Sequence, residues 1–131
     1  MAETKPKVLL VDDEKFLDEI YSIKFLKLGF DLFACTSADE ALAALKNGYD
    51  PDAILFDITM PEKNGYEFLE GLSGVKLKPS CVKIALTNEG LIGEVGRTAE
   101  LGVDAHWIKA RYTPGEVVEK VKKLLGPPDL L

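Results

Sequence analysis

Short apolar runs alternate with amphipathic stretches along this chain of 131 residues. The apolar runs have the length of strands, and the stretches between them repeat apolar residues close to the helical period. This alternation predicts an α/β domain, a doubly wound five-stranded parallel sheet with five helices. Right-handed crossovers favour the flavodoxin-like strand order 2-1-3-4-5. The predicted strands cover residues 7–11, 30–35, 53–57, 82–86 and 105–108.

Capping signals set most of the predicted helix boundaries. Ser37 with Glu40, and Thr113 with Glu116, have the spacing of capping boxes. A proline follows Thr113 at the first helical position, where its missing N–H costs nothing. The predicted helices cover residues 14–28, 38–47, 65–72, 90–101 and 114–125.

Two of these helices have distinctive sequences. In the first, Phe16, Ile20 and Ile23 repeat near the helical period, and Gly29 is expected to end the helix. The fourth, residues 90–101, has Gly93 and Gly96 in its interior and is therefore weak by intrinsic propensity. This plasticity would suit a two-state element, although a tolerated pair of glycines explains it equally well.

Composition limits the classes of protein to which the chain can belong. A hydrophobic fraction of 47% and a charged fraction of 29% are typical of one globular domain, predicted at residues 6–126 with a short tail at 127–131. The net charge of −6 argues against nucleic acid or an anionic membrane as a direct partner. No apolar run approaches the roughly 20 residues of a membrane helix. Cys35 and Cys81 form no CxxC pattern, which favours reduced thiols in a cytoplasmic protein.

Carboxylates follow two strands that the predicted order places side by side. Asp12 and Asp13 come directly after strand 7–11, and Asp57 closes strand 53–57. Ligands of such sheets bind at the carboxyl ends of the strands, at the switch point between strands one and three. Three crowded carboxylates repel one another, and a divalent cation relieves this. We expect Mg²⁺ on Asp13, Asp57 and a backbone carbonyl near Thr59, with Asp12 acting through water.

A hydroxyl and an ammonium group are predicted at the same rim, the edge of the sheet where the strands have their carboxyl ends. Thr87 follows the fourth strand and Lys109 the fifth. A bare cation site has no use for a lysine, whereas a site that receives a phosphoryl group does, because its oxygens must be neutralised. A carboxylate is a competent nucleophile for forming an aspartyl-phosphate. Asp57 is the best candidate, since it lies centrally on the rim.

With these residues the sequence resembles the receiver domain of bacterial two-component response regulators, most closely the compact chemotaxis-regulator type. Four motifs occur in order, each at a predicted strand end. They are Val11-Asp12-Asp13-Glu14, Phe56-Asp57-Ile58-Thr59-Met60-Pro61 with Gly65, Leu86-Thr87 and Ile108-Lys109.

The resemblance implies a signalling domain rather than an enzyme, one that promotes its own phosphorylation and dephosphorylation. Asp57 would accept phosphate from a phosphohistidine on a sensor histidine kinase or a histidine phosphotransfer protein, with Mg²⁺ required. Thr87 and Lys109 would read the phosphate and bias the domain toward an active conformation that controls a downstream protein. Homodimerisation on phosphorylation would be compatible with this.

The sequence departs from the family pattern near Lys109. Ala110 stands where receivers usually have proline, often after a cis peptide bond. His106 stands where they usually have an aromatic residue that rotates inward on activation. His106 would therefore either take part in a switch that differs from the usual one and is partly pH-sensitive, or simply pack at this edge of the sheet. Both interpretations stay open.

The sequence lacks residues that two other phosphate-handling classes of protein need. A phosphatase of the haloacid-dehalogenase type also forms an aspartyl-phosphate, but it needs an acid two residues after the nucleophile, where this chain has Thr59. A flavodoxin-like binding module needs a hydroxyl- and glycine-rich phosphate loop after the first strand, where this chain has Asp12 and Asp13. The remaining alternative is a receiver-like interaction module that works without phosphorylation.

Overall fold

A five-stranded parallel sheet forms the centre of the computed structural model, which describes residues 5–60, 62–87 and 102–125. Its order, β2-β1-β3-β4-β5, confirms the predicted topology. The observed strand bounds differ from the predicted ones by one residue at most. They are β1 Lys7–Val11, β2 Asp31–Cys35, β3 Ala53–Asp57, β4 Val82–Thr87 and β5 Ala105–Ile108.

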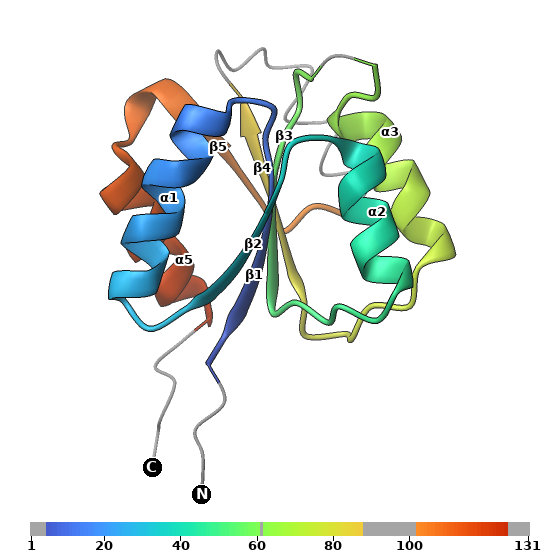
Figure 1. The fold of residues 1–131 in the computed structure, drawn as a ribbon, viewed down its shortest axis with the longest axis horizontal. Coiled ribbons are helices and arrows are strands. Elements are labelled where there is room, and N and C mark those ends of the chain that lie inside the picture. Colours follow the sequence, from blue (N-terminus) through green and yellow to red (C-terminus); the bar gives the residue numbers. More distant parts are fainter. Residues whose placement is uncertain (1–4, 61, 88–101, 126–131) are drawn as a thin grey trace, which may run out of the picture.

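Helices cover both faces of this sheet. Figure 1 shows α1 and α5 on one face and α2 and α3 on the other. The predicted helix at residues 90–101 lies outside the described residues. The described helices are α1 Lys15–Lys27, α2 Ala38–Lys46, α3 Gly65–Gly71 and α5 Pro114–Leu125, with short 3₁₀ turns at Leu72–Gly74 and Lys109–Arg111. None of these helices has the length and apolar character needed to span a membrane.

The central strands explain why the sheet is covered on both sides. All five residues of β3 are buried, as a parallel strand between two helical layers requires. Along β1, Val8 and Leu10 belong to the hydrophobic cluster under α1 and α5, whereas Leu9 and Val11 belong to the one under α2 and α3. Each such side chain contributes about 1.5–3 kcal/mol on burial, so the sheet is a rigid platform for its carboxyl edge.

Of the two predicted capping boxes, the one at α5 forms completely and the one at α2 forms in part, and α3 also has a capping box. Thr113 and Glu116 form a reciprocal box at α5, with N–O distances of 3.2 and 2.9 Å. Asn64 caps α3 and forms a complete box with the third residue of that helix. At α2, Ser37 accepts the Glu40 N–H at 3.1 Å, but the Glu40 carboxylate accepts the N–H of the preceding Thr36 instead of closing the box.

Helix α1 buries the side opposite to the apolar repeat seen in the sequence. Phe16 and Ile23 are 73% and 56% exposed, while Tyr21 and Phe25 lie in the core. The helix carries apolar residues nearly all round, so two stripes compete for the sheet. The stripe with the two aromatic rings buries more area and takes the core position.

Candidate functional site

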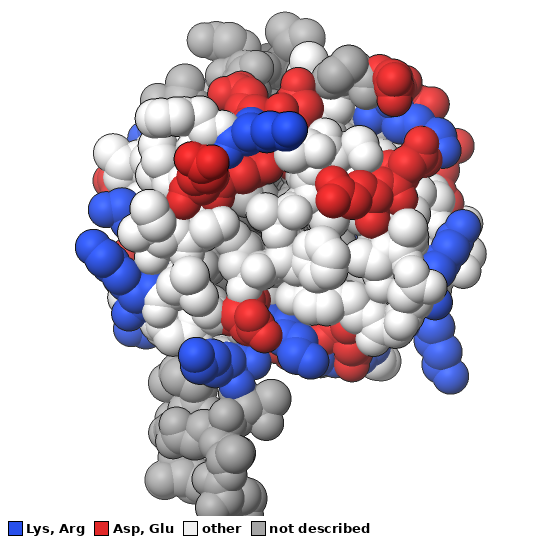
Figure 2. Space-filling view, in the orientation of Figure 1, with Lys and Arg blue, Asp and Glu red and all other residues white. Residues whose placement is uncertain are grey.

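The carboxyl edge of the sheet brings the three predicted acids together. Pairing of Val11 with Phe56 places the end of β1 beside the end of β3. Carboxylate oxygens of Asp12, Asp13 and Asp57 lie within 4.8 Å of one another. Asp12 and Asp57 are buried, whereas Asp13 is exposed. In Figure 2 acidic side chains gather toward the upper edge of the molecule, where β1 and β3 end in Figure 1.

Lys109 is the cation at the centre of this cluster. Its Nζ lies 2.6 Å from Asp12 Oδ2, 3.2 Å from Asp57 Oδ2 and 3.7 Å from Glu14 Oε1. Burial alone would lower the pKa of Lys109, but the hydrogen bond to Asp12 and the charge of Asp57 raise it above the usual value. The lysine therefore stays charged and partly neutralises two buried carboxylates.

Asp57 is held in one orientation by its neighbours. Its Oδ1 accepts the backbone N–H of Thr59 at 3.1 Å, and its Oδ2 faces Lys109. Burial raises the pKa of the Asp57 carboxyl, the charge of Lys109 lowers it and that of Asp12 raises it, with a net upward shift. A second positive charge at the site would favour the ionised, nucleophilic form of Asp57.

The donor set fits a hard divalent cation. Asp12 Oδ1 accepts a hydrogen bond from the Glu14 backbone N–H at 2.9 Å. The Asp12 carboxylate therefore stabilises the turn before α1 as well as facing Lys109. Asp13 and Asp57 keep further lone pairs for a cation, and oxygen ligands are those that Mg²⁺ prefers. Within the described ranges this is the single acidic or thiol-containing cluster compact enough for a metal. Thr59 enters the site through its N–H, while its carbonyl has no described contact there.

Thr87 and His106 form a separate pair at the same edge. The Thr87 hydroxyl lies 3.1 Å from His106 Nε2, and Thr87 is only 1% exposed. The structure thus brings Asp12, Asp13, Asp57 and Lys109 into one cluster. It also places the Thr87 hydroxyl beside the His106 imidazole, a contact that the sequence did not predict.

Comparisons with known proteins identify the family. A profile of the response regulator receiver domain matches residues 8–122. This chain is a response regulator receiver domain. It is 33% identical over 119 residues to the response regulator SaeR of Staphylococcus aureus, covering 90% of this chain and 50% of SaeR. The chain thus spans about half the length of the curated relatives that it matches.

Solved receiver structures have the same fold. A CheY-like receiver domain protein from Methanospirillum hungatei superposes with a TM-score of 0.81 at 25% identity, covering 93% of this chain and 94% of that one. The receiver domain of the Francisella response regulator 1452 gives 0.78 at 25% identity, covering 92% and 97%. The CheY4 chemotaxis protein of Vibrio cholerae gives 0.81 at 22% identity, covering 92% and 99%, which supports the fold alone.

One residue of this receiver domain was missed by sequence reasoning. Asp18 of α1 is 5% exposed, and neither carboxylate oxygen has a hydrogen-bond partner among the described residues. Burial raises the pKa of Asp18 to about 7; the charge of Asp12 adds to this and that of Lys109 opposes it. The spacing of Asp18, Tyr21 and Phe25 was the available signal, since it places an acid on the aromatic stripe of α1.

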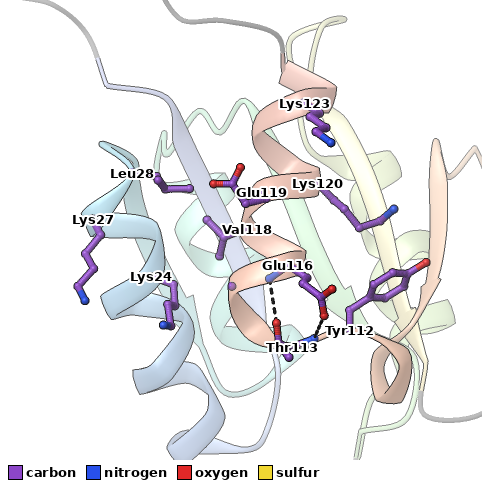
Figure 3. A pocket seen from close by; sticks show the side chains of 11 residues that line it. Lys24, Lys27, Leu28, Tyr112, Thr113, Glu116, Val118, Glu119, Lys120 and Lys123 are labelled. Carbon is purple, nitrogen blue, oxygen red and sulfur yellow. Dashed lines mark hydrogen bonds between the residues drawn. The ribbon is translucent and has the colours of Figure 1, made fainter.

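A groove of about 630 Å³ between α1 and α5 lies apart from the acidic cluster. Figure 3 shows Lys24 and Lys27 on its α1 side and the Thr113–Glu116 capping box of α5 at one end. None of the predicted site residues lines it. The groove shares no residue with the acidic cluster at the carboxyl edge of the sheet.

Gly65 gives a prediction about the loop that follows Asp57. A Cβ at this position would lie 2.7 Å from both the Asp57 carbonyl oxygen and the Ile58 Cα. We expect Gly65→Ala to lower the free energy of unfolding by about 1–3 kcal/mol, because backbone must move to make room. Gly74→Ala is the matched control, since nothing lies within 4 Å of that position. Equal urea midpoints for the two variants would contradict the close approach.

Proposed function

We propose that Asp57 accepts a phosphoryl group from a phosphohistidine on a sensor histidine kinase or a histidine phosphotransfer protein. The observation that carries the proposal is the position of Asp57: 1% exposed, fixed at one oxygen by Thr59 and 3.2 Å from the Lys109 Nζ at the other. Membership of the receiver family supports the same role.

The chemistry follows from these side chains. An oxygen of Asp57 attacks phosphorus, an O–P bond forms, the N–P bond of the donor breaks, and the imidazole leaves with the electron pair. Lys109 would pair with one of the equatorial oxygens of the phosphoryl group, and the Thr87 hydroxyl would donate to another. Mg²⁺, held by Asp13, Asp57 and the Thr59 carbonyl and through water by Asp12, would neutralise further negative charge on the phosphoryl group.

Phosphorylation would then act as a conformational signal. A new dianionic group beside Lys109 and Thr87 shifts an existing equilibrium between two states, to the extent that these contacts differ between them. His106, which is hydrogen-bonded to Thr87, belongs to this switch. The output is a changed affinity for a downstream protein or for a second copy of the domain. The stretch that matches this chain makes up half of the curated relative SaeR.

A small donor with an N–P bond tests this proposal. Phosphoramidate carries the same kind of bond as phosphohistidine and requires no cognate kinase. We expect one phosphoryl group per chain by intact mass, only when Mg²⁺ is present, and its removal by hydroxylamine, which cleaves acyl phosphates. An adduct that resists hydroxylamine would place the phosphoryl group elsewhere. No adduct from phosphoramidate or from a phosphorylated kinase domain would leave the phosphorylation-independent interaction module as the better reading.

A further inference from the structure

The Thr87–His106 pair is set by the register of two neighbouring strands. In the β4–β5 ladder Ala85 lies opposite His106, and Thr87 lies opposite Ile108. Side chains two residues apart point to the same face of a sheet, so Thr87 and His106 are diagonal neighbours on one face. Their polar atoms, Thr87 Oγ1 and His106 Nε2, meet at 3.1 Å. A phenylalanine at position 106 could form no such bond.

The hydrogen-bonding capacity of the two groups restricts how they can work together. A threonine hydroxyl has one proton to donate and can accept two bonds. A neutral imidazole carries a proton on only one of its nitrogens. If Thr87 gives its proton to a phosphoryl oxygen on Asp57, it can keep its bond to His106 only by accepting it. The His106 Nε2 must then carry a hydrogen.

We propose that His106 is a positioning residue that donates its Nε2–H to the Thr87 hydroxyl and so directs the Thr87 proton to the phosphoryl group. The inference rests on the proposed function of Asp57 and Thr87. It gives this receiver domain a relay of two hydrogen bonds, from imidazole to hydroxyl to phosphoryl oxygen. Thr87 is buried and its β-branched side chain has few rotamers, so a donor on one side leaves its single proton for the other.

The single histidine of the chain makes the relay directly observable. The untagged protein labelled with ¹⁵N in the imidazole gives one pair of ring nitrogens by NMR, which distinguishes the two neutral tautomers and the imidazolium. With Mg²⁺ and beryllium fluoride, a mimic of the phosphoryl group, we expect Nε2 to carry a hydrogen. In Thr87→Val, which removes the hydroxyl and keeps the shape, the Nε2 signal should no longer change when beryllium fluoride is added. A bare Nε2 in the loaded wild-type protein would overturn the inference.

Binding of beryllium fluoride gives an independent readout. Loss of one neutral hydrogen bond corresponds to about a five-fold loss of affinity, and we expect this for His106→Phe. His106→Gln, whose amide N–H can donate from a similar position, should stay within about two-fold of wild type. In a Thr87→Val background, His106→Phe should have no further effect, because the relay is already broken.

The outcomes separate this inference from the function on which it rests. Failure of wild-type protein to bind beryllium fluoride with Mg²⁺ would count against the proposed function and would overturn the relay with it. Normal wild-type binding, with His106→Phe and His106→Gln equally weakened or with additive effects in the Thr87→Val background, would overturn the relay alone. If His106 had a merely structural role, beryllium fluoride would not change the tautomer of its imidazole.

Discussion

Replacing Asp18 by leucine is expected to raise the free energy of unfolding at pH 8, unlike most substitutions of a buried residue. Both carboxylate oxygens of Asp18 lack hydrogen-bond partners among the described residues, and its pKa is raised from 3.8 to about 7. A shift of that size corresponds to a penalty on the order of 4 kcal/mol once the folded carboxyl is ionised. The favourable interaction of an acid with the first turn of a helix, about 0.3–1 kcal/mol, is too small to offset this.

The pH dependence follows from the same shift. The unfolded Asp18 ionises near pH 3.8, whereas the folded one keeps its proton up to about pH 7. Between these values only the folded state binds the proton, so the Asp18 contribution makes stability fall as pH rises through this window. Asp18→Leu should lose this part of the pH dependence. The stabilisation over wild type should be small at pH 4 and largest above pH 7.

Urea unfolding of wild type and variant between pH 4 and pH 8 measures this difference. Glu19→Leu is a suitable control, because it replaces an exposed acid on the same helix and should change stability by no more than about 0.5 kcal/mol. If the free energies of unfolding of wild type and Asp18→Leu changed in parallel across this pH range, the prediction would be wrong. Asp18 would then be ionised in the folded protein, with its charge compensated by a neighbouring group.

Lys109→Met is expected to lower the free energy of unfolding by about as much as Asp18→Leu raises it. Within the described residues, Lys109 is the basic group within 4 Å of the carboxylates of Asp12 and Asp57. Removing it leaves two buried acids without their counter-charge, which costs about 3–5 kcal/mol. Without divalent cations, urea unfolding at pH 7 should show a loss of this order.

Mg²⁺ should rescue this variant more than it helps the wild type. The cation and the lysine ammonium repel each other and compete for the same carboxylates, so Lys109→Met should bind Mg²⁺ about tenfold more tightly. Binding to the folded state alone then restores stability as Mg²⁺ is added. Lys63→Met, which breaks the exposed 2.6 Å ion pair with Asp39, should change stability little and should be stabilised by Mg²⁺ only as much as the wild type is. Equal Mg²⁺ affinities of Lys109→Met and wild type would argue against a cation in this cluster.

The sheet and its acidic rim could be predicted because both depend on local patterns. Short apolar runs locate parallel strands, and a strand end locates whatever follows it, so Asp12, Asp57 and Lys109 could be brought together without coordinates. The predicted strand order needed only the handedness of the crossovers. Roles on the rim, such as metal ligand or phosphate acceptor, depend on ligands and remain proposals.

Features that depend on packing could not be predicted. The buried side of α1 was decided by competition between two apolar stripes, which places Asp18 inside and Phe16 outside. The Thr87–His106 bond depends on the register of β4 and β5, which neither strand carries in its own sequence. Register is fixed by side-chain packing over the whole sheet, so a one-residue slip would have turned His106 to the other face.

Intact-mass analysis with acetyl phosphate tests the central claim most directly, on wild type and Asp57→Asn with and without Mg²⁺. The asparagine keeps the shape of the side chain and removes the nucleophilic carboxylate. We expect wild type to gain a single phosphoryl group only with Mg²⁺, and Asp57→Asn to gain none under any condition. An equal adduct on Asp57→Asn, or a wild-type adduct independent of Mg²⁺, would contradict the assignment of Asp57 as the phosphoacceptor of a cation-assisted site.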